Sequence, residues 1–449
     1  GIRQSGTLGQ VIKKLLPQGK TTVFKAQLRI LPSVAFISAF LNNTPVVVIF
    51  APIIKHWAKS VKLPATKFLI PLSYVTILGG ICTLIGTSTN LVVHGMILEA
   101  GYEGFTMFEL GKVGIFIAIA GIIYLFIFSK RLLPDARPDT AVPDEEVEEG
   151  EKLHRVEAVL GARFPGINKK LSDFNFQRHY GAEVKEIKTR NGQRYVDHLE
   201  DVVLREGDTL VVMADDTFIP TWGESSVFVL LTNGNDPDTS GKKKRWLALI
   251  LLVLMIVGAT VGELPATKEM FPDIKLDMFF FVCITTIIMA WTNIFPARKY
   301  TKYISWDILI TIACAFAISK AMVNSGVADC VAGFIIGLSD DYGPHVLLAI
   351  LFVITNLFTE LITNNAAAAL AFPLALSISA QLGVSPTPFF VVICMAASAS
   401  FSTPIGYQTN LIVQGIGNYK FTDFVRIGLP LNIITFLISV ILIPLIWNF

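Results

Sequence analysis

Charged residues are scarce in this sequence. Only 16% of its 449 residues are Asp, Glu, Lys or Arg, whereas about a quarter are charged in an ordinary soluble domain. The formal net charge of +2 provides no basic surface for a nucleic acid, so no nucleic-acid partner is expected. The six histidines are scattered, and the sequence contains no catalytic triad, phosphate-binding loop or metal-binding cluster. We therefore do not expect an enzyme.

Cysteines are also few, and they form no framework. All lie in or beside apolar segments, with the spacing of neither metal ligands nor a disulfide scaffold. The sequence predicts that they are small core residues. The five cysteines are Cys82, Cys283, Cys314, Cys330 and Cys394.

Long apolar runs, in contrast, are abundant. Hydrophobic residues make up 53% of the chain, and the mean hydropathy is +0.59. A helix needs about 20 mostly apolar residues to cross a bilayer. The sequence therefore predicts an all-α polytopic membrane protein embedded in a lipid bilayer. The longest apolar runs are 246–262, 278–295 and 427–447, and shorter or interrupted runs lie at 68–82, 114–129, 345–358, 366–379 and 387–401.

Residues 134–245 break this membrane pattern. They begin with the acidic linker PDEEVEEGEK and continue with a block of soluble character. In 154–161, alternating hydrophobicity predicts a strand with Val156, Ala158 and Leu160 on one face. Such a block indicates a small α/β module inserted between two membrane parts.

Further elements are expected in this module. They are a helix around 167–178, a hairpin that turns at Asn191-Gly192 and a strand after a turn at Glu206-Gly207. The core of the module would cover about 152–216. The remainder, up to Gly241, is interpreted as a linker or a remnant of a second module.

Two polar motifs occur twice, in the same order. NNTPVVVIFAPI at 42–53 is similar to TNNAAAALAFPL at 363–374, and TLIGTSTNLVVHG at 83–95 is similar to TPIGYQTNLIVQG at 403–415. Two such matches at one spacing predict an internal repeat. The expected organisation is a first repeat over 1–133, the module over 134–245 and a second repeat over 246–449. The matched positions are Ser38/Thr359, Asn43/Asn364, Pro52/Pro373, Thr83/Thr403, Gly86/Gly406, Asn90/Asn410 and Gly95/Gly415.

The repeat also predicts a gap. Three apolar spans, 246–262, 278–295 and 304–323, precede the second pair of motifs, and their counterparts would lie before the first residue of this chain. We therefore expect about three further N-terminal spans. The opening GIRQSGTLGQ is also not typical of a true start.

Basic residues indicate the orientation, because lysine and arginine favour the cytoplasmic side of short loops. They flank the module on both sides, so the module is expected in the cytoplasm, beneath a plasma (inner) membrane. They also follow the first motif, whereas the loop QLGVSPTP after its copy has none. The two motif segments would then enter from opposite faces, which makes the repeats inverted in topology. The basic residues are Lys55, Lys59, Lys62, Lys67, Lys130, Arg131 and 242–245.

Polar and helix-breaking residues interrupt the apolar runs at the motifs. Such breaks are tolerated in a membrane only where protein or a water-filled cavity surrounds them. Unwound carbonyls and side-chain oxygens can bind a cation, and half-helix N-termini can bind an anion. The motifs carry almost no formal charge, so neutral oxygens would hold sodium ions, and N–H, amide and hydroxyl groups would hold an anion.

Glu360 and Asp307 are exceptions, since each places a carboxylate in an apolar run. Carboxylates within a membrane are costly and commonly functional. The alternative is a structural role, as a partner for a nearby lysine or for unpaired backbone N–H groups. The two interpretations are equal for Glu360, and the structural one is favoured for Asp307.

Residues 26–133 and 246–449 resemble the divalent anion–sodium symporter family of the ion-transporter superfamily. In that family each repeat carries a re-entrant hairpin that ends in a Ser-Asn-Thr motif, followed by a helix unwound at a Gly/Thr/Pro/Asn segment. The resemblance implies a homodimer in which a transport domain slides like an elevator past a scaffold domain. The module at about 152–216, with its ending GDTLVV, resembles the TrkA-C (RCK-C) module of potassium-transport regulators. This resemblance implies a gating or sensing module with a small regulatory ligand, and the alternative is a module that only stabilises the dimer.

The resemblance also implies which residues bind the cargo. The implied substrate-binding residues are Asn42, Asn43, Thr44, Thr87, Thr363, Asn364, Asn365, Thr403 and Pro404. The implied sodium ligands are Ser38, Asn43, Gly79, Gly80, Thr83, Thr359, Asn364 and Ser402. Asn42 and Asn365 depart from the family motif, which usually has Ser and Thr at these positions.

The inserted module is similar to that of sulfate-type and uncharacterised permeases. The favoured hypothesis is therefore a sodium-coupled transporter of sulfate or a related divalent anion. The first alternative is a symporter or exchanger of dicarboxylates such as succinate, malate or citrate. The others are a module-gated anion channel or nutrient sensor, and a carrier of other oxyanions or one coupled to protons.

Overall fold

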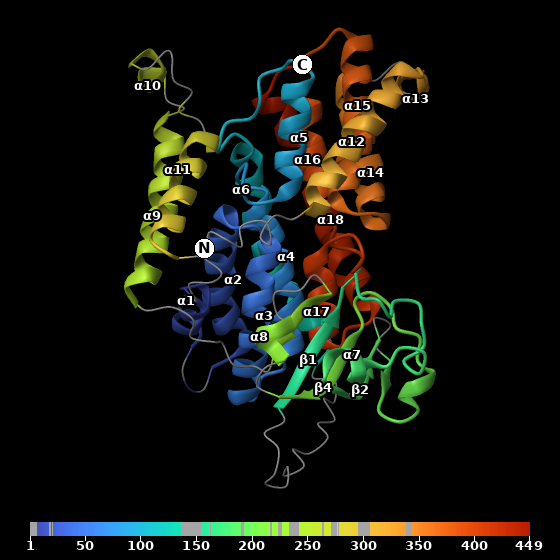
Figure 1. Cartoon of the computed structure of the whole chain (residues 1–449). Helices are drawn as coiled ribbons and strands as arrows, with labels where there is room; N and C mark the ends of the chain where they lie inside the picture. The colour runs from blue at the N-terminus through green and yellow to red at the C-terminus, as the bar shows by residue number, and fades with distance from the viewer. Residues whose placement is uncertain are drawn as a thin grey trace.

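A computed structural model gives the fold of the chain (Figure 1). Within the residues that it describes, the chain is mostly helical and contains one small β-sheet. The described residues are 7–17, 19, 21–135, 154–161, 163–189, 193–215, 218–222, 227–232, 242–262, 265–270, 276, 278–294, 306–337 and 343–449.

In the part of the chain that the structure describes, five helices are long and apolar enough to cross a membrane. Several shorter apolar helices accompany them, which is the pattern expected when spans are interrupted. The prediction of a helical, polytopic membrane protein is confirmed. The five helices are Val23–Phe40, Gly111–Leu132, Gly343–Leu361, Asn364–Leu382 and Phe421–Ile446.

The helices form two series that follow the sequence repeat. The first series is α1 (Thr7–Leu15), α2 (Val23–Phe40), α3 (Asn43–Ser60), α4 (Leu69–Gly80), α5 (Ser88–Glu99) and α6 (Gly111–Leu132). The second is α13 (Val327–Gly337), α14 (Gly343–Leu361), α15 (Asn364–Leu382), α16 (Thr387–Ser398), α17 (Gln408–Gly417) and α18 (Phe421–Ile446). Between them lie α9 (Lys242–Gly262), α10 (Pro265–Met270), α11 (Met278–Trp291) and α12 (Trp306–Asn324).

Each series contains one helical hairpin and one broken helix. The hairpins are α2–α3 and α14–α15, and they point into the molecule from opposite ends (Figure 1). The broken helices are α4–α5, interrupted at 81–87, and α16–α17, interrupted at 399–407. This arrangement confirms two inverted repeats with a re-entrant hairpin and a broken helix in each.

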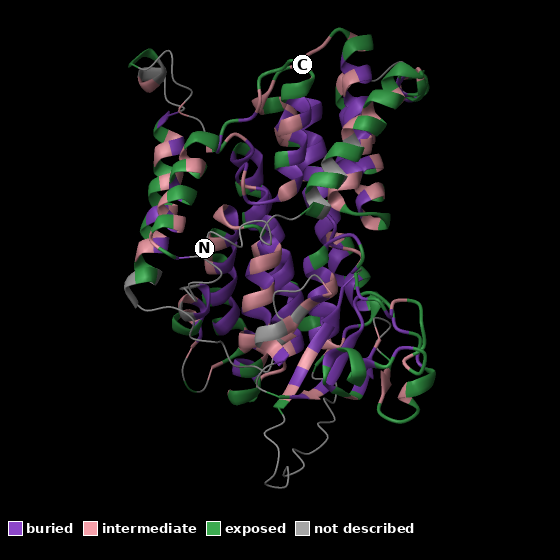
Figure 2. Cartoon of the chain, viewed as in Figure 1, coloured by how far each residue is buried: buried purple, intermediate pink, exposed green. Residues whose placement is uncertain are grey.

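Burial sorts the helices into an inner and an outer group (Figure 2). All residues of α4 are buried, whereas α18 exposes large apolar side chains at every fourth position along one side. Side chains four apart share a helix face, so α18 presents an apolar stripe to the surrounding lipid. The stripe consists of Leu429, Ile433, Leu437, Ile441 and Leu445.

The cysteines are not all core residues. Cys394 is buried, and Cys82 and Cys283 are partly buried, but Cys314 and Cys330 are exposed. The prediction is therefore wrong for the last two. They lie on α12 and α13, where apolar character marks an outer helix surface instead of a core.

The inserted module contains a five-stranded antiparallel sheet in the order β3-β2-β4-β1-β5. Val156, Ala158 and Leu160 of β1 are buried in its core, as predicted. Strand β4 follows a turn whose Gly207 has φ +84°, also as predicted. The strands are β1 (His154–Leu160), β2 (Glu183–Lys188), β3 (Arg194–Tyr195), β4 (Thr209–Ala214) and β5 (Phe228–Thr232).

Two predictions for the module need correction. The first is its extent, because α8 (Phe218–Trp222) and β5 complete the core beyond residue 216. Strand β5 pairs with β1, so this segment is neither a linker nor a remnant. The predicted turn at Asn191-Gly192 lies outside the described residues.

The second correction concerns the helix expected around 167–178. Only α7 (Phe176–Tyr180) forms. The preceding backbone is instead bonded to a neighbouring segment, with Asn168 N donating to Leu204 O and Leu171 N to Val202 O. Asn168 also has φ +62°, a left-handed conformation that ends a helix. Long-range backbone pairing therefore overrides the local helical pattern.

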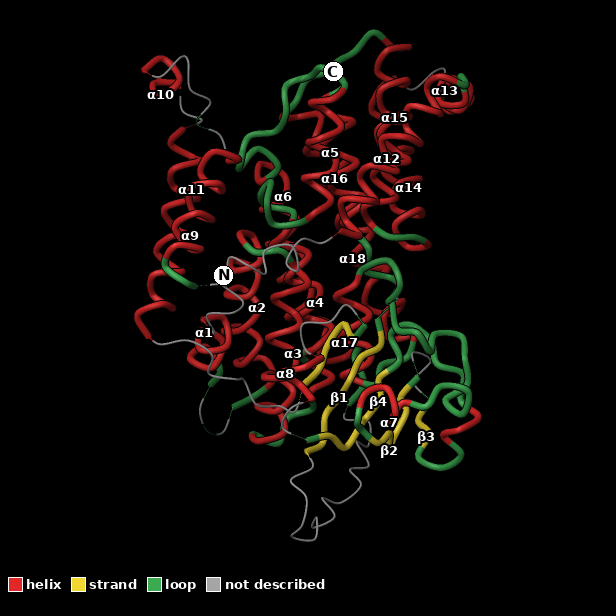
Figure 3. The backbone as a smooth tube through the Cα atoms, viewed as in Figure 1, coloured by secondary structure: helices red, strands yellow, loops and turns green. Residues whose placement is uncertain are grey.

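One face of the sheet forms the core of the module. The opposite face packs against the membrane helices, at the end where α3 and α17 lie (Figure 3). Val159 of β1 belongs to the hydrophobic core of the helices. Lys55 of α3 donates to Glu157 of β1 at 3.0 Å, and Lys188 of β2 approaches the same carboxylate at 3.4 Å. The module thus contacts a hairpin arm directly.

Candidate functional site

Each of the two hairpin tips forms hydrogen bonds with the broken helix of the other repeat. Asn43 follows the tip of the first hairpin, and its Nδ2 donates to the hydroxyl of Tyr407 at 2.7 Å. The same hydroxyl lies 2.7 Å from Thr87 Oγ1. Thr87 and Tyr407 occupy matching positions in the two repeats, so the hydrogen bond between them lies on the pseudo-two-fold axis.

The contacts around this axis are reciprocal. Thr44 Oγ1 donates to Gln408 Oε1 at 3.2 Å, and Ser88 Oγ donates to Asn365 Oδ1 at the same distance. Thr44 corresponds to Asn365, and Gln408 corresponds to Ser88. Each hairpin tip therefore contacts the helix start that follows the break in the other repeat.

Asn364 belongs to the same network. Its Nδ2 donates to Thr89 Oγ1 at 2.6 Å, and Thr89 also approaches Asn365 Oδ1 at 3.4 Å. The structure thus brings together five of the nine predicted substrate-binding residues. They are Asn43, Thr44, Thr87, Asn364 and Asn365.

Asn42 and Thr363 have a different place, because both are exposed N-caps. Asn42 Oδ1 accepts from Thr44 N, and Thr363 Oγ1 accepts from Ala366 N, each at 3.4 Å. N-caps of this kind fix where a helix begins. They direct the positive ends of α3 and α15 toward the meeting point of the tips.

Neutral oxygens gather beside Asn43 in the first repeat. Ser38 Oγ donates to Asn43 Oδ1 at 2.8 Å. A Cβ placed on Gly80 would lie 2.6 Å from Asn43 Oδ1 and 3.1 Å from the carbonyl oxygen of Gly86. The absence of a side chain at Gly80 therefore lets these oxygens approach one another, and such a set of hydroxyl, amide and carbonyl oxygens suits a hard cation.

Gly79 and Thr83 serve the surrounding structure. A Cβ on Gly79 would clash with the backbone carbonyl of Ala35, so this glycine lets α4 approach α2. Thr83 Oγ1 donates to Ala39 O and accepts from Gly86 N at 3.1 Å. The Thr83 hydroxyl thus holds the unwound segment against the end of α2.

The second repeat follows this arrangement only in part. Thr403 Oγ1 donates to Glu360 O at 3.0 Å and accepts from Gly406 N at 3.4 Å, as its counterpart Thr83 does with Ala39 and Gly86. Thr359 differs, because its Oγ1 donates to Ala397 O at 2.7 Å, whereas its counterpart Ser38 donates to Asn43. Pro404 is buried. These residues surround the second break instead of facing the tips.

The Glu360 carboxylate lies at this second break. Its Oε1 accepts from Ser402 N at 2.9 Å and from Asn432 Nδ2 at 2.7 Å. Ser402 Oγ accepts from the same Asn432 amide at 2.9 Å. Asp307 belongs to α12, and its side chain lies outside what the structure describes.

Sequence analysis missed four residues of the central network. They are Ser88, Thr89, Tyr407 and Gln408. A signal was present, because each lies within the repeated motif next to a matched residue. Comparing only identical positions concealed three of them, since Thr87 matches Tyr407 and Ser88 matches Gln408. Thr89 matches Thr409 and was overlooked although the two are identical.

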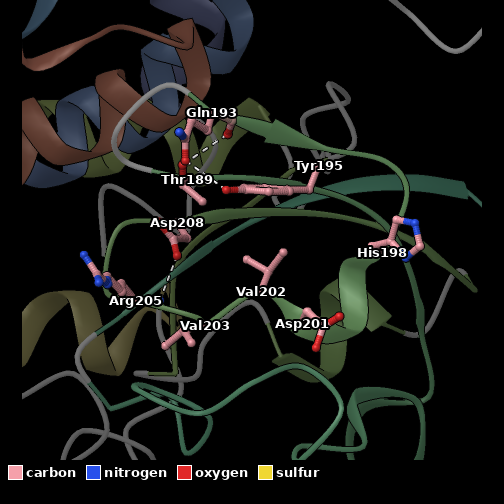
Figure 4. A pocket seen from close by; sticks show the side chains of 9 residues that line it. All are labelled: Thr189, Gln193, Tyr195, His198, Asp201, Val202, Val203, Arg205 and Asp208. Carbon is pink, nitrogen blue, oxygen red and sulfur yellow. Dashed lines mark hydrogen bonds between the residues drawn. The ribbon is translucent and has the colours of Figure 1, made fainter.

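The module carries a separate hollow of about 340 Å³ (Figure 4). Its lining combines charged and aromatic side chains, among them Tyr195, His198 and Arg205. Asp208 Oδ2 accepts from Arg205 N at 2.7 Å and shapes one wall. The residues that line this hollow lie between Thr189 and Asp208. None of them is among the residues predicted to bind the anion or sodium.

Comparison with known proteins supplies the family. The sequence profile of the citrate transporter family (CitMHS) matches residues 1–381 and again 270–449. An uncharacterised transporter of Synechocystis, sll0640, is 29% identical over 100% of this chain and 87% of its own length. A putative sulfur deprivation response regulator of Chlamydomonas reinhardtii is 28% identical over 98% of this chain and 90% of its own length.

A third relative is more similar over a shorter stretch. A probable sodium/sulfate cotransporter of Chlamydomonas reinhardtii is 32% identical over 62% of this chain and 31% of its own length. These similarities agree with the paired hairpins and broken helices. The chain belongs to the citrate transporter family and is therefore a membrane transporter, not an enzyme.

Proposed function

We propose that this protein is a sodium-coupled symporter of a small divalent anion, with sulfate as its best substrate. The observation that carries the proposal is the reciprocal contact of two hairpin tips with the opposite broken helices. Two polar, broken half-sites that meet inside a membrane protein are suited to holding an ion and releasing it on either side.

The side chains of the hydrogen-bonded network between the hairpin tips and the broken helices are uncharged. This supports a dianion that is carried together with sodium. Helices α3 and α15 direct their N-terminal N–H groups and positive partial charge toward this network. Amides and hydroxyls add further donors, while sodium ions bound to neutral oxygens would balance the charge of the anion. We propose that Asn43, Thr44, Thr87, Asn364 and Asn365 contact the anion. Ser38, Asn43, Gly80, Thr359, Asn364 and Ser402 are the proposed sodium ligands.

Asn42, Thr363, Gly79, Thr83, Thr403 and Pro404 shape the site in this proposal and make no contact with the cargo. The transport domain would slide as an elevator within a homodimer. The module, which resembles TrkA-C, would lie in the cytoplasm beneath the plasma membrane and bind a small regulatory ligand. Its hollow is a candidate for that ligand, because charged and polar groups line it.

Two observations bear on the choice of anion. One relative is named a probable sodium/sulfate cotransporter, and the sequence of the inserted module resembles that of sulfate-type permeases. The family, however, is described by citrate transport, which keeps dicarboxylates and citrate as the alternative substrates. Hydroxyl and amide donors suit either an oxyanion or a carboxylate.

The test is uptake by the purified protein in liposomes. We expect labelled sulfate to accumulate in a sodium gradient and not when choline replaces sodium. Excess succinate or citrate should compete weakly for a sulfate carrier and strongly for a dicarboxylate carrier. Uptake that is indifferent to sodium, or absent for every anion tested, would reject the proposal.

A sensor is the competing function of another class. It is favoured by the relative named a sulfur deprivation response regulator, which aligns with 98% of this chain. A sensor would bind sulfate in a thermal-shift assay but show no flux in the same liposomes, and an anion channel would show single-channel current. Measuring binding and flux on one preparation therefore separates the three functions.

A further inference from the structure

Helices α3 and α17 come from different repeats and are joined at the central network. Helix α3 begins at Asn43, and α17 begins at Gln408, directly after Tyr407. Asn43 Nδ2 donates to Tyr407 OH at 2.7 Å. Thr44 Oγ1 donates to Gln408 Oε1 at 3.2 Å. Whatever holds these two helices together therefore also holds the two halves of the site together.

The module contacts the same two helices further along their length. On α3, Lys55 donates to Glu157 of β1 at 3.0 Å. On α17, a Cβ placed on Gly415 would lie 3.8 Å from Thr209 Cβ of β4. Val159 and Thr209 are partners in the pairing of β1 with β4, and Glu157 lies two positions before Val159, so all three share one face of the sheet. A single sheet face therefore contacts both helices.

The internal repeat provides a comparison for this contact. Gly415 matches Gly95 of α5. The atom nearest to a Cβ on Gly415 is Thr209 Oγ1 of the module, whereas a Cβ on Gly95 would meet Phe316 Cζ of α12 at 3.8 Å. The close approach of the module is therefore a feature of the α3–α17 pair, because the matching position in the α15–α5 pair faces another helix.

The polar groups of this contact suit an interface that opens and closes. Thr209 Oγ1 is buried and has no hydrogen-bond partner among the residues that the structure describes. A buried hydroxyl without a partner costs free energy, and water can satisfy this hydroxyl once the module leaves α17. The side chains of Lys55 and Glu157 are 22% and 16% exposed, so both charges are already near water. All three groups can be hydrated when the module separates.

The central network is closed in this structure, since side chains of α3 and of the start of α17 are bonded directly to one another. An anion can bind between them only when these bonds open and the starts of the two helices move apart. A sheet attached to both helices opposes this movement. When the form that can bind is less populated, the apparent affinity falls by the same factor.

We propose that the module is an inhibitory clamp on α3 and α17, which holds the central network closed while docked and raises the affinity for the anion when released. The proposal rests on the proposed function in one respect, that the anion binds between the hairpin tips. It adds how the module acts on that site. The clamp works through strands β1 and β4, which carry Glu157 and Thr209.

The test locks the clamp covalently in the whole chain. In the double variant Thr209→Cys with Gly415→Cys, the two Cβ atoms lie 3.8 Å apart, a separation typical of disulfides. Oxidation should join the module to α17, which proteolysis and mass spectrometry detect. The sulfate concentration for half-maximal uptake in liposomes should then rise by about fivefold or more, and a reductant should reverse the rise.

The controls for the lock are the wild type and the two single-cysteine variants, treated with the same oxidant. The five native cysteines all lie outside residues 154–232, so they cannot form a cross-link within the module, and both single variants should show uptake that oxidant and reductant leave unchanged. Two folded single variants whose cysteines do not join in the double variant would contradict the docked contact itself.

A release variant tests the opposite direction. Lys55→Met removes the helix side of the ion pair, while Glu157 keeps Lys188 at 3.4 Å, so the module stays folded. The sulfate concentration for half-maximal uptake should fall by about threefold or more. Lys59→Met is the matched control, because Lys59 is an exposed lysine one turn further along α3, and it should leave this concentration unchanged.

A second measurement does not depend on transport. Hydrogen exchange of peptides covering 41–48 and 406–412 reports how often the starts of α3 and α17 open. Exchange should be slower in the oxidised double variant than after reduction, and faster in Lys55→Met than in the wild type. Exchange that ignores both the cross-link and Lys55→Met would overturn the clamp.

The clamp and the symporter fail in different ways. Exchange that follows the clamp, in a protein without uptake of any anion, would support the clamp and reject the symporter. Sodium-driven sulfate uptake, together with exchange and half-saturation that ignore the cross-link, would do the reverse.

Discussion

At the scale of single residues, one hydroxyl joins the two halves of the molecule. Tyr407 OH lies 2.7 Å from both Asn43 Nδ2 and Thr87 Oγ1, so it connects a hairpin tip of one repeat with both broken segments. Its ring is almost fully buried, and water cannot replace the hydroxyl at low cost. The function of the site should therefore be unusually sensitive to this one atom.

We predict that Tyr407→Phe folds but loses anion uptake by about tenfold or more, because Asn43 and Thr87 lose a partner at a cost of about 1–3 kcal/mol. Uptake rates in liposomes and the thermal unfolding midpoint measure the two effects. The control is Tyr419→Phe, which removes a buried hydroxyl that donates to Thr66 O at 2.5 Å. It should lower stability by a similar amount and leave the anion affinity of the folded protein unchanged.

At the scale of elements, two glycines of the first broken helix differ in how closely other atoms approach them. Gly80 ends α4, where a Cβ would press against the Asn43 amide, whereas a Cβ on Gly95 inside α5 would make only an ordinary contact with one side chain. The first glycine is required by a close approach, and the second is not. The same residue type in one broken helix therefore provides a matched pair.

Gly80→Ala should raise the sodium concentration for half-maximal uptake by about tenfold, because the new Cβ would lie 2.6 Å from Asn43 Oδ1. Gly95→Ala should leave uptake unchanged, since the nearest atom to its Cβ is Phe316 Cζ at 3.8 Å, and it should stabilise the helix slightly. Sodium-dependent uptake of the two variants is the measurement. Equal behaviour of the pair would contradict the placement of sodium beside Asn43.

Much of this element structure was predictable. Asn42 and Thr363 lie at helix starts because short polar side chains cap helices, and that signal is local in sequence. The segment 167–178 was mispredicted because backbone bonds to 202–204 decide its conformation, and no local pattern encodes such pairing. Tyr407 and Asn432 were missed for a related reason, since their importance arises from contacts with residues far away in the chain.

At the scale of the whole molecule, the module is attached to helices of both repeats. Lys55 of α3 pairs with Glu157 of the sheet, and a Cβ on Gly207 of the module would lie 2.6 Å from Leu411 of α17. Burial alone would raise the pKa of Glu157, but Lys55 and Lys188 outweigh it and lower the pKa from 4.5 to about 2. This lowering corresponds to ~3 kcal/mol that favours the ionised carboxylate in the folded protein, and Lys55 supplies the part that depends on docking.

Because its pKa in the folded protein lies below the ordinary value, Glu157 stabilises the folded form fully above about pH 4.5. The contribution is lost as the pH falls toward 2. We predict that Glu157→Gln at pH 7 exposes the module to limited proteolysis and lowers its unfolding midpoint. The effect should shrink as the pH falls below about 4.5 and vanish only below pH 2, where the wild type has lost the same interaction.

Glu183→Gln is the control for docking. Glu183 pairs with Lys185 at 2.7 Å, but both side chains are 54% exposed, and exposed pairs contribute little. Its replacement should not change proteolysis of the module. If both variants behave alike, the contact between Lys55 and Glu157 does not hold the module.

The unequal pair on the pseudo-two-fold axis has a consequence for the working cycle. In a carrier made of inverted halves, the outward-open and inward-open forms are related by exchanging the roles of the halves. Thr87 opposite Tyr407, and Ala39 opposite Glu360, make that exchange imperfect. The two forms should therefore differ in free energy, and the unloaded protein should rest mainly on one side of the membrane, which gives transport a preferred starting point.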